Sequence, residues 1–304
     1  MVRSRSQNLR QEIRLSFSPE SSRGVERAFR GATNTVEPLE DPWRSKGAGL
    51  KEAREHTPNL TTANAEFRSR LSLWAIVAYV LEFFRMQPDL IFDVGCHNGN
   101  DTSYYLSRGF RVVAVEAHPQ YCSAMYQRFP EAIAAGRLYV LNFAIAERPG
   151  LCTLLESQAE SQWNTVVPEI AAQKSGDFRE IIVPALTFNC VFERFNTPYY
   201  LKVDIEGSEI NVFRYLVDRP QYISFEVNSD FSSILRILRD LGYTRYKLVN
   251  QRLIHLEAYA SSGPFGEDAA GRWVNDKVLE EQLCTAQAPD RRHPDDWFDV
   301  HVGL

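Results

Sequence analysis

An aspartate and two glycines stand close together in the segment IFDVGCHNGN, residues 91–100. Asp93 ends a short apolar run typical of a strand buried on both faces, and Gly99 lies near the start of an expected helix. Glycine lets a ligand approach the backbone closely, and a helix N-terminus offers free N–H groups. The candidate contacts to a nucleoside-type cofactor in this loop are Asp93, Gly95, His97, Asn98 and Gly99.

Two details distinguish this loop from the loops that bind dinucleotides. The dinucleotide pattern G-x-G-x-x-G is missing, and the spacing here is D-x-G-x-x-x-G. An aspartate at this place would repel a pyrophosphate. It suits the ammonium and sulfonium groups of S-adenosylmethionine, which has no phosphate. The loop therefore indicates S-adenosylmethionine as the cofactor.

Glu116 is the last residue of the next apolar run, in VVAVEAHP, and follows Gly99 by 17 residues. An acidic side chain at this place can accept hydrogen bonds from both ribose hydroxyls. His118 either flanks the adenosine or belongs only to the turn. Asn142, at the end of LYVLN, either faces the adenine edge or has a simple turn role. Glu116 and Asn142 join the candidate cofactor contacts.

The segment KVDIEGSE, residues 202–209, carries the residues that could act on an acceptor. Alternate residues of a strand share a face, so Lys202, Asp204 and Glu206 tend to point together, and Glu226 ends the following strand. These residues could bind the acceptor and take its proton, hold a divalent cation, or form a salt-bridged structural network. We prefer the first interpretation and assign no metal ligand. Asp204 is the strongest candidate for contact with both cofactor and acceptor.

The motifs DVGCHNGNDTSYYL, VVAVEAHP, LKVDIEGSE and ISFEV together resemble those of the FkbM-type methyltransferases. The resemblance covers about residues 89–255, and LKVDIEGSE is its most specific part. It implies the class I methyltransferase fold, a Rossmann-like, doubly wound, mostly parallel sheet of seven strands. One departure is His97, because members of the family commonly have Asn at that position.

The resemblance also implies transfer of a methyl group to oxygen. We expect a transferase of the S-adenosylmethionine-dependent class that methylates a hydroxyl of a small molecule, a sugar, or a glycan- or lipid-linked acceptor. Two alternatives stay open: a nicotinamide-dependent oxidoreductase, and a relic that binds the cofactor without catalysis. N-methylation is not excluded, and the sequence does not identify the acceptor.

Strands and helices must alternate to position these residues, and the apolar runs fit this expectation. Helices are expected at 101–108, 119–129, 209–216 and 231–241, and core strands at 89–94, 111–116, 138–145, 199–205, 222–227, 246–250 and 297–302. Such alternation predicts a mostly parallel sheet with helices on both faces and ligands at the carboxyl ends of its strands. Two further β segments, 151–156 and 180–186, flank a polar loop whose Trp163 and Asn164 would overhang the site.

Three regions are expected. Residues 1–60 are polar and lack steady periodicity, so we expect a disordered or loosely docked extension. Residues 61–260 would form the methyltransferase domain, beginning with a helix over 66–86 that Pro88 ends. Residues 261–304 would form a lid-like segment, with GPFGEDAAGRW at 263–273, and a closing strand.

Composition restricts the partners. The net charge of −5 argues against a nucleic-acid surface, and the five widely spaced cysteines indicate reduced thiols rather than a disulfide framework or a zinc site. The richest apolar segment, residues 71–84, is short for a bilayer and contains Glu82, so we expect no membrane span and a cytoplasmic protein. The oligomeric state stays open.

Overall fold

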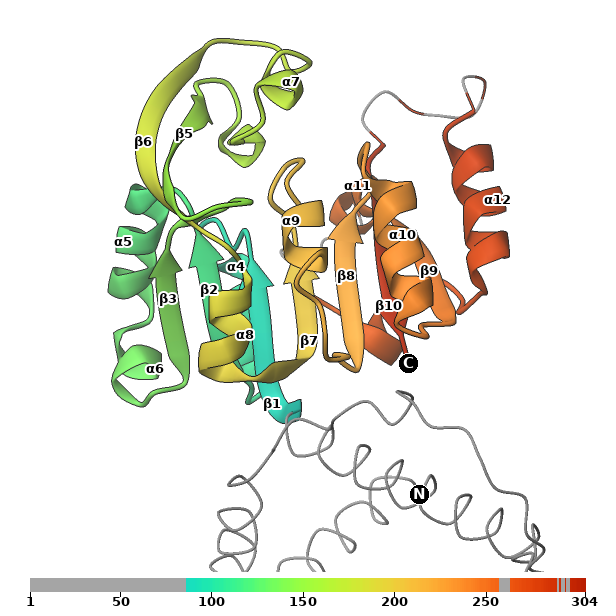
Figure 1. The fold of residues 1–304 in the computed structure, drawn as a ribbon, viewed down its shortest axis with the longest axis horizontal. Helices are drawn as coiled ribbons and strands as arrows, with labels where there is room; N and C mark the ends of the chain where they lie inside the picture. The colour runs from blue at the N-terminus through green and yellow to red at the C-terminus, as the bar shows by residue number, and fades with distance from the viewer. Residues whose placement is uncertain (1–85, 257–262, 289, 291–292, 294–295) are drawn as a thin grey trace, which may run out of the picture. The chain divides into compact units, whose positions relative to one another are not determined.

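The computed structural model describes residues 86–256, 263–288, 290, 293 and 296–304 (Figure 1). In this part of the chain a main sheet has the strand order β3-β2-β1-β7-β8-β10-β9. Its strands are β1 (Met86–Val94), β2 (Arg111–Glu116), β3 (Leu138–Asn142), β7 (Thr197–Val203), β8 (Tyr222–Glu226), β9 (Arg245–Asn250) and β10 (Phe298–Gly303). The expected class I methyltransferase fold, with a mostly parallel seven-stranded sheet, is confirmed.

The register of this sheet brings the carboxyl ends of four neighbouring strands together. Val94 of β1 lies beside Val115 of β2 and Val203 of β7, and Val203 lies beside Phe225 of β8. Only β10 runs antiparallel, between β8 and β9. Because parallel strands end at the same edge, the loops that follow them converge there.

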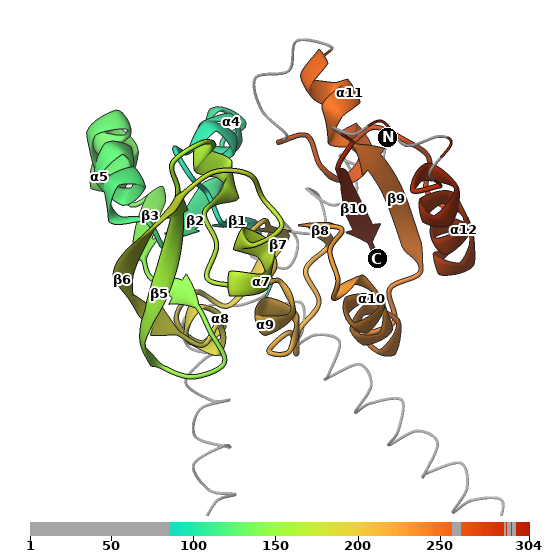
Figure 2. The same ribbon diagram turned by 90° about the horizontal axis from the view of Figure 1, so that it is seen from above.

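Helices cover both faces of the sheet (Figure 2). One face carries α4 (Asn100–Ser107), α5 (Pro119–Arg128) and α6 (Pro130–Ala134), and the other carries α8 (Asn189–Phe195), α9 (Ile210–Phe213) and α10 (Phe231–Asp240). Toward the C-terminus, α11 (Gln251–Leu256) follows β9, and α12 (Asp276–Ala286) packs on β9. No helix of the described residues is long and apolar enough to cross a membrane.

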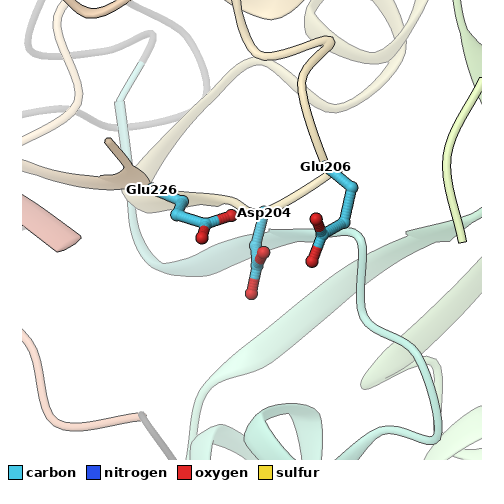
Figure 3. Close-up of side chains that lie close together, drawn as sticks. All are labelled: Asp204, Glu206 and Glu226. Carbon is cyan, nitrogen blue, oxygen red and sulfur yellow. The ribbon is translucent and has the colours of Figure 1, made fainter. Parts of the chain in front are cut away.

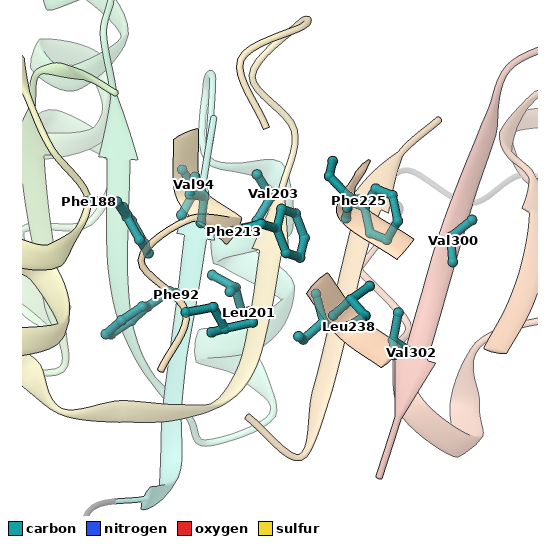
Figure 4. Close-up of a cluster of buried hydrophobic side chains, with 14 of the residues drawn as sticks. Phe92, Val94, Phe188, Leu201, Val203, Phe213, Phe225, Leu238, Val300 and Val302 are labelled. Carbon is teal, nitrogen blue, oxygen red and sulfur yellow. The ribbon is translucent and has the colours of Figure 1, made fainter. Parts of the chain in front are cut away.

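The hydrophobic core explains why the strand sequences are almost continuously apolar. Phe92 and Val94 of β1 pack into the layer under α8, α9 and α10 (Figure 4), whereas Ile91, the residue before Phe92, packs under α4 and α5. A strand covered on both faces needs apolar side chains on both sides. Asp93, the last residue but one of β1, is therefore an exception in this buried strand.

A second, smaller sheet extends beyond the carboxyl ends of β2 and β3 (Figure 1). It has the order β4-β6-β5, with β4 (Ala144–Ile145), β5 (Gly150–Ser157) and β6 (Phe178–Leu186). We call residues 150–186 the arm. Between its two strands lie η1 (Ser161–Trp163) and α7 (Pro168–Ala171). The expected β segments 151–156 and 180–186 are thus the two strands of the arm.

Several expected boundaries were wrong. The single strand expected at 138–145 is two strands in different sheets, because the chain leaves the main sheet after Asn142. Asn142 stabilises this turn, since its Nδ2 donates to the carbonyls of Glu116 and Ala117, each at 2.9 Å. The helix expected from 209 to 216 is the shorter α9, and α8 and α12 were not expected.

The N-terminal boundary also differs. Met86 was expected to end a helix, but it begins β1, where it pairs with Thr197. Pro88, which has no N–H to donate, lies in a register shift between Gln87 and Ile91. The extension at 1–60, the apolar segment 71–84 and the rest of the expected helix lie outside the described residues.

The segment 263–273 packs at the end of the sheet away from the converging loops. Phe265 stacks on Tyr200 with ring centroids 3.9 Å apart and planes 7° apart, and Lys247 donates to the carbonyls of Gly266 and Ala269. Trp273 stacks on Tyr222, the first residue of β8. The structure thus places this expected lid against the amino-terminal halves of the strands.

Candidate functional site

A cavity of about 590 Å³ lies at the carboxyl ends of the strands. Its volume is in the range of small-molecule sites. Its walls come from the loops after β1, β2, β7 and β8, from the arm, and from the start of β10. The predicted site residues that line it are Gly95, His97, Asn98, Glu116, Lys202, Asp204, Glu206 and Glu226.

Glu116 forms a fixed carboxylate in the wall of the cavity. The backbone N–H of His97 donates to its Oε2 at 2.8 Å, and the N–H of His118 donates to its Oε1 at 2.7 Å. Burial raises its pKa, and these two N–H groups act in the opposite direction. Each carboxylate oxygen keeps further acceptor capacity.

His97 stands in the left-handed backbone region, with a φ of 48°. Asn, Asp and His are the non-glycine residues that adopt this region most readily. His can therefore occupy, at position 97, a backbone conformation that also suits the Asn expected from the family resemblance. The His97 ring packs on Tyr121, with centroids 4.2 Å apart, and its Nε2 lies 3.0 Å from Ser161 Oγ of the arm.

The two glycines of the loop are required by contacts within the protein. A Cβ at Gly95 would lie 1.6 Å from the carbonyl oxygen of Asp204. A Cβ at Gly99 would lie 2.9 Å from the ring of Phe129, and Gly99 caps α4 in the left-handed conformation. Gly95 lines the cavity but Gly99 does not, so only Gly95 is near a ligand in it.

Asp93 lies beneath the cavity and not in its wall. Its side chain is buried, and its Oδ2 accepts a hydrogen bond from Thr102 at 2.6 Å. Burial raises its pKa to about 6, and the nearby charge of Lys202 opposes that rise. Asp93 therefore stabilises the connection between β1 and α4.

Lys202 is buried among three aspartates. Its Nζ lies 3.0 Å from Asp204 Oδ2 and 3.3 Å from Asp101 Oδ2. Burial opposes its charge, but Asp204, Asp101 and Asp93 together raise its pKa well above the ordinary value. Lys202 therefore remains an ammonium that positions Asp204.

Asp204, Glu206 and Glu226 point toward one another in the cavity (Figure 3). Their nearest oxygens all lie within 4.8 Å of one another. Burial raises the pKa of Glu206 to about 7, with Asp204 adding to the rise, and burial raises the pKa of Glu226 well above its ordinary value. The structure thus brings together the acidic residues that the sequence grouped.

Glu209 fixes the loop that carries two of these acids. Its buried carboxylate accepts hydrogen bonds from the N–H groups of Ile205 and Gly207 and from Asn228. Glu206, between the two donors, has a φ of 53°. Glu209 therefore holds the backbone of the loop that carries Asp204 and Glu206.

The arm covers the cavity from above. Lys174 lies 3.4 Å from Glu206 Oε2, and the hydroxyl of Thr165 donates to the Glu206 carbonyl at 2.7 Å. Trp163 and Asn164 line the cavity, as expected for a loop that overhangs the strand ends. The arm therefore contacts both the glycine loop, through Ser161, and the loop after β7.

A family model described as "Methyltransferase FkbM domain" matches residues 93–245, half of the chain. The chain belongs to the FkbM methyltransferase family. Membership of a methyltransferase family implies S-adenosylmethionine as the methyl donor. No curated protein sequence matches the chain.

Solved structures of methyltransferases are similar to this FkbM protein at low identity. Precorrin-6y C5,15-methyltransferase from Geobacter metallireducens is 10% identical, with a TM-score of 0.32, over 73% of this chain and 85% of that one. An O-methyltransferase from Bacillus cereus in complex with SAH is 11% identical, with a TM-score of 0.30, over 71% and 74% of the two chains.

Two residues of the FkbM domain that the sequence placed near the cofactor, Asn142 and His118, lie outside the lining of the cavity. Asn142 does not line the cavity, and its amide holds the turn after β2. His118 caps α5: its Nδ1 accepts from the N–H of Gln120, so its Nε2 carries the proton that faces Glu156 at 2.9 Å. These positions fit the turn roles that the sequence analysis gave as alternatives for Asn142 and His118.

The polar residues that line the cavity and that the sequence analysis missed include Ser161, Lys174, Gln251 and Asp299. They come from the arm, from α11 and from β10, far along the chain from the motifs. Of these four residues, only Asp299 could have been placed on an element of the sheet from the sequence, because it lies in the predicted strand WFDVHV, residues 297–302. Its position opposite Glu226 could not be predicted without knowing the strand order.

Proposed function

We propose that this protein transfers the methyl group of S-adenosylmethionine to a hydroxyl oxygen of a small molecule, a sugar, or a glycan- or lipid-linked acceptor. The observation that carries the proposal is the cavity, which joins the fixed Glu116 carboxylate on one side to Asp204, Glu206 and Glu226 on the other. Membership of the FkbM family supports it. The preference for oxygen follows from the family resemblance.

The cofactor binds, in this proposal, in the half formed by the loops after β1 and β2. Glu116 accepts hydrogen bonds from the ribose hydroxyls with the acceptor capacity that its two N–H partners leave. Gly95, His97 and Asn98 contact the rest of the molecule. Asp93 and Asn142 contribute indirectly, by holding the loops.

The acceptor binds between the arm and the carboxylates. Methyl transfer is a direct displacement, so the protein must align the acceptor oxygen, the methyl carbon and the sulfur. The oxygen–methyl bond forms as the methyl–sulfur bond breaks, and the hydroxyl proton passes to a carboxylate. Asp204 fits this role, since Lys202 fixes its Oδ2 while 42% of its side-chain surface is exposed.

Calorimetric titration with S-adenosylmethionine tests the cofactor half. We expect the wild type to bind and Glu116→Gln to bind about 10- to 100-fold more weakly, because hydrogen bonds to a charged group contribute about 1.5–3 kcal/mol. Glu131→Gln, an exposed change on α6, is the matched control and should bind as the wild type does. Binding of NAD without binding of S-adenosylmethionine would contradict the proposal.

Transfer of a labelled methyl group into extracted metabolites and glycans tests the acceptor half. We expect a mass-shifted product with the wild type. Asp204→Asn should retain most of its affinity for the cofactor and form the product at least about 100-fold more slowly, because a positioned base contributes about 10²–10⁴-fold. Unchanged transfer by Asp204→Asn would rule out its role as the base.

A further inference from the structure

Asp204, Glu206 and Glu226 have the spacing of ligands to one hard cation. They come from the end of β7, the loop after it and the end of β8, and their nearest oxygens lie within 4.8 Å of one another (Figure 3). Divalent cations take oxygen ligands at about 2.0–2.6 Å, so two ligands of one ion lie at most about 5 Å apart. One ion can therefore contact all three residues.

Within the described residues, the negative charges around Asp204, Glu206 and Glu226 exceed the positive ones. Asp299 stands directly opposite Glu226 in the register of β10 and β8, and like charges in that position are destabilising. Lys202 and Lys174 pair with Asp204 and Glu206. Within the described part of the chain, Glu226 and Asp299 form no ion pair with a lysine or arginine. Because Lys202 is also shared with Asp101 and lies near Asp93, carboxylates outnumber ammonium groups around these residues.

Gln251 provides a second, independent observation. It lines the same cavity, and only 2% of its surface is exposed. Its Nε2 donates to Asp299 Oδ2 at 2.6 Å, but its carbonyl oxygen Oε1 is buried without a hydrogen-bond partner among the described residues. A buried carbonyl without a partner is costly, so this oxygen indicates a group that the described residues do not supply.

We propose that the cavity binds one divalent cation between Asp204, Glu206 and Glu226, with Asp299 and Gln251 as further oxygen acceptors beside it. A divalent ion supplies two positive charges to a site in which carboxylates outnumber the lysines. The ammonium group of an acceptor would supply only one. Under the proposed function, the ion lowers the pKa of the acceptor hydroxyl and orients it toward the methyl group. The binding of the ion does not depend on that function.

Titration of the full chain with Mn²⁺, followed by the loss of the free Mn²⁺ resonance signal, tests the proposal. We expect one ion per chain in the absence of S-adenosylmethionine. Glu226→Gln and Glu206→Gln should each weaken binding at least about tenfold, a loss of about 1.4 kcal/mol. Glu131→Gln on α6 is the matched control and should leave Mn²⁺ affinity unchanged. Thermal unfolding of each variant checks that it is folded.

The outcomes separate this inference from the proposed function. Absence of saturable Mn²⁺ binding in the wild type, or equal binding in folded Glu226→Gln and Glu206→Gln, overturns the cation site. Binding of glucosamine but not glucose, dependent on Glu226 and without Mn²⁺ binding, also overturns it and assigns the carboxylates to an ammonium group. Binding of Mn²⁺ without binding of S-adenosylmethionine would leave the cation site standing and overturn the proposed function.

Discussion

At Gly95 the chain that leaves β1 crosses the chain that leaves β7. The two backbones are so close that a Cβ would lie 1.6 Å from the Asp204 carbonyl, and the φ of 82° is in the left-handed region. The glycine therefore holds a candidate cofactor loop against a candidate catalytic loop. Any side chain at this position would separate the two halves of the cavity.

Gly95→Ala should lower the free energy of unfolding by about 3–6 kcal/mol. About 1–2 kcal/mol comes from the left-handed conformation, and the rest comes from displacing the Asp204 backbone. Urea unfolding measures the loss. Gly109→Ala is the matched control, because Gly109 has a φ of 88° and nothing within 4 Å of its Cβ position. We expect that control to lose only the conformational part, and equal losses would show that the crossing tolerates a methyl group.

The sequence pattern placed some of the site residues correctly and others not. The end of an apolar strand placed Glu116 at the edge of the sheet, where the structure has it in the cavity wall. The same reasoning placed Asp93 near the ligand, but its side chain points under the loop to Thr102. A residue at a strand end can face either the cavity or the layer below. The pattern of apolar residues does not distinguish the two cases.

At the scale of elements, the strands were predicted better than the helices. Strands buried on both faces are short apolar runs that stand out, as β1 and β2 do. The helix α12 was missed, although Asn275 caps it by accepting from the Val278 N–H and Leu279 and Leu283 share its buried face. Its polar, glycine-rich surroundings concealed this signal.

The arm is tied to the loop after β7 by few bonds, and Thr165 makes one of them. Thr165→Val should remove the hydrogen bond to the Glu206 carbonyl and cost about 1 kcal/mol. Because the bond joins two elements, amide hydrogen exchange should accelerate across residues 158–177 rather than through the core. Thr153→Val on β5 is the control, and acceleration in both variants alike would contradict this role of Thr165.

At the scale of the whole molecule, the alternation of strands and helices was sufficient to predict the main sheet. It did not reveal the arm as a separate sheet, because β4 contains only Ala144 and Ile145. The sequence also did not show which residues from distant parts of the chain meet at the cavity. Asp299 and Gln251 reach the cavity because β10 returns antiparallel between β8 and β9, a step that depends on the packed fold.

The same strand, β10, carries a buried histidine, His301, that we expect to make the folded molecule sensitive to acid. His301 is 3% exposed, and its Nδ1 has no hydrogen-bond partner among the described residues. Burial lowers its pKa to about 3, and the charges of Lys247 and Lys202 act in the same direction. An unfolded histidine has a pKa of about 6.5, so below that pH the unfolded chain binds a proton that the folded chain excludes. We therefore expect the contribution of His301 to stability to be fully present above about pH 6.5 and to be lost as the pH falls toward 3.

His301→Gln should make the protein less sensitive to acid. Each pH unit below about 6.5 costs the wild type up to about 1.4 kcal/mol through this group, so between about pH 7.5 and pH 5 the loss is about 2 kcal/mol. Urea unfolding at both pH values gives the loss of unfolding free energy for wild type and variant.

Carboxylates with raised pKa values, such as Glu209, change stability in the opposite direction, but they contribute equally to both proteins. The difference between the two losses therefore isolates His301, with His293→Gln at an exposed position as the control. If His301→Gln and His293→Gln lose the same free energy over this range, His301 does not cause the acid sensitivity.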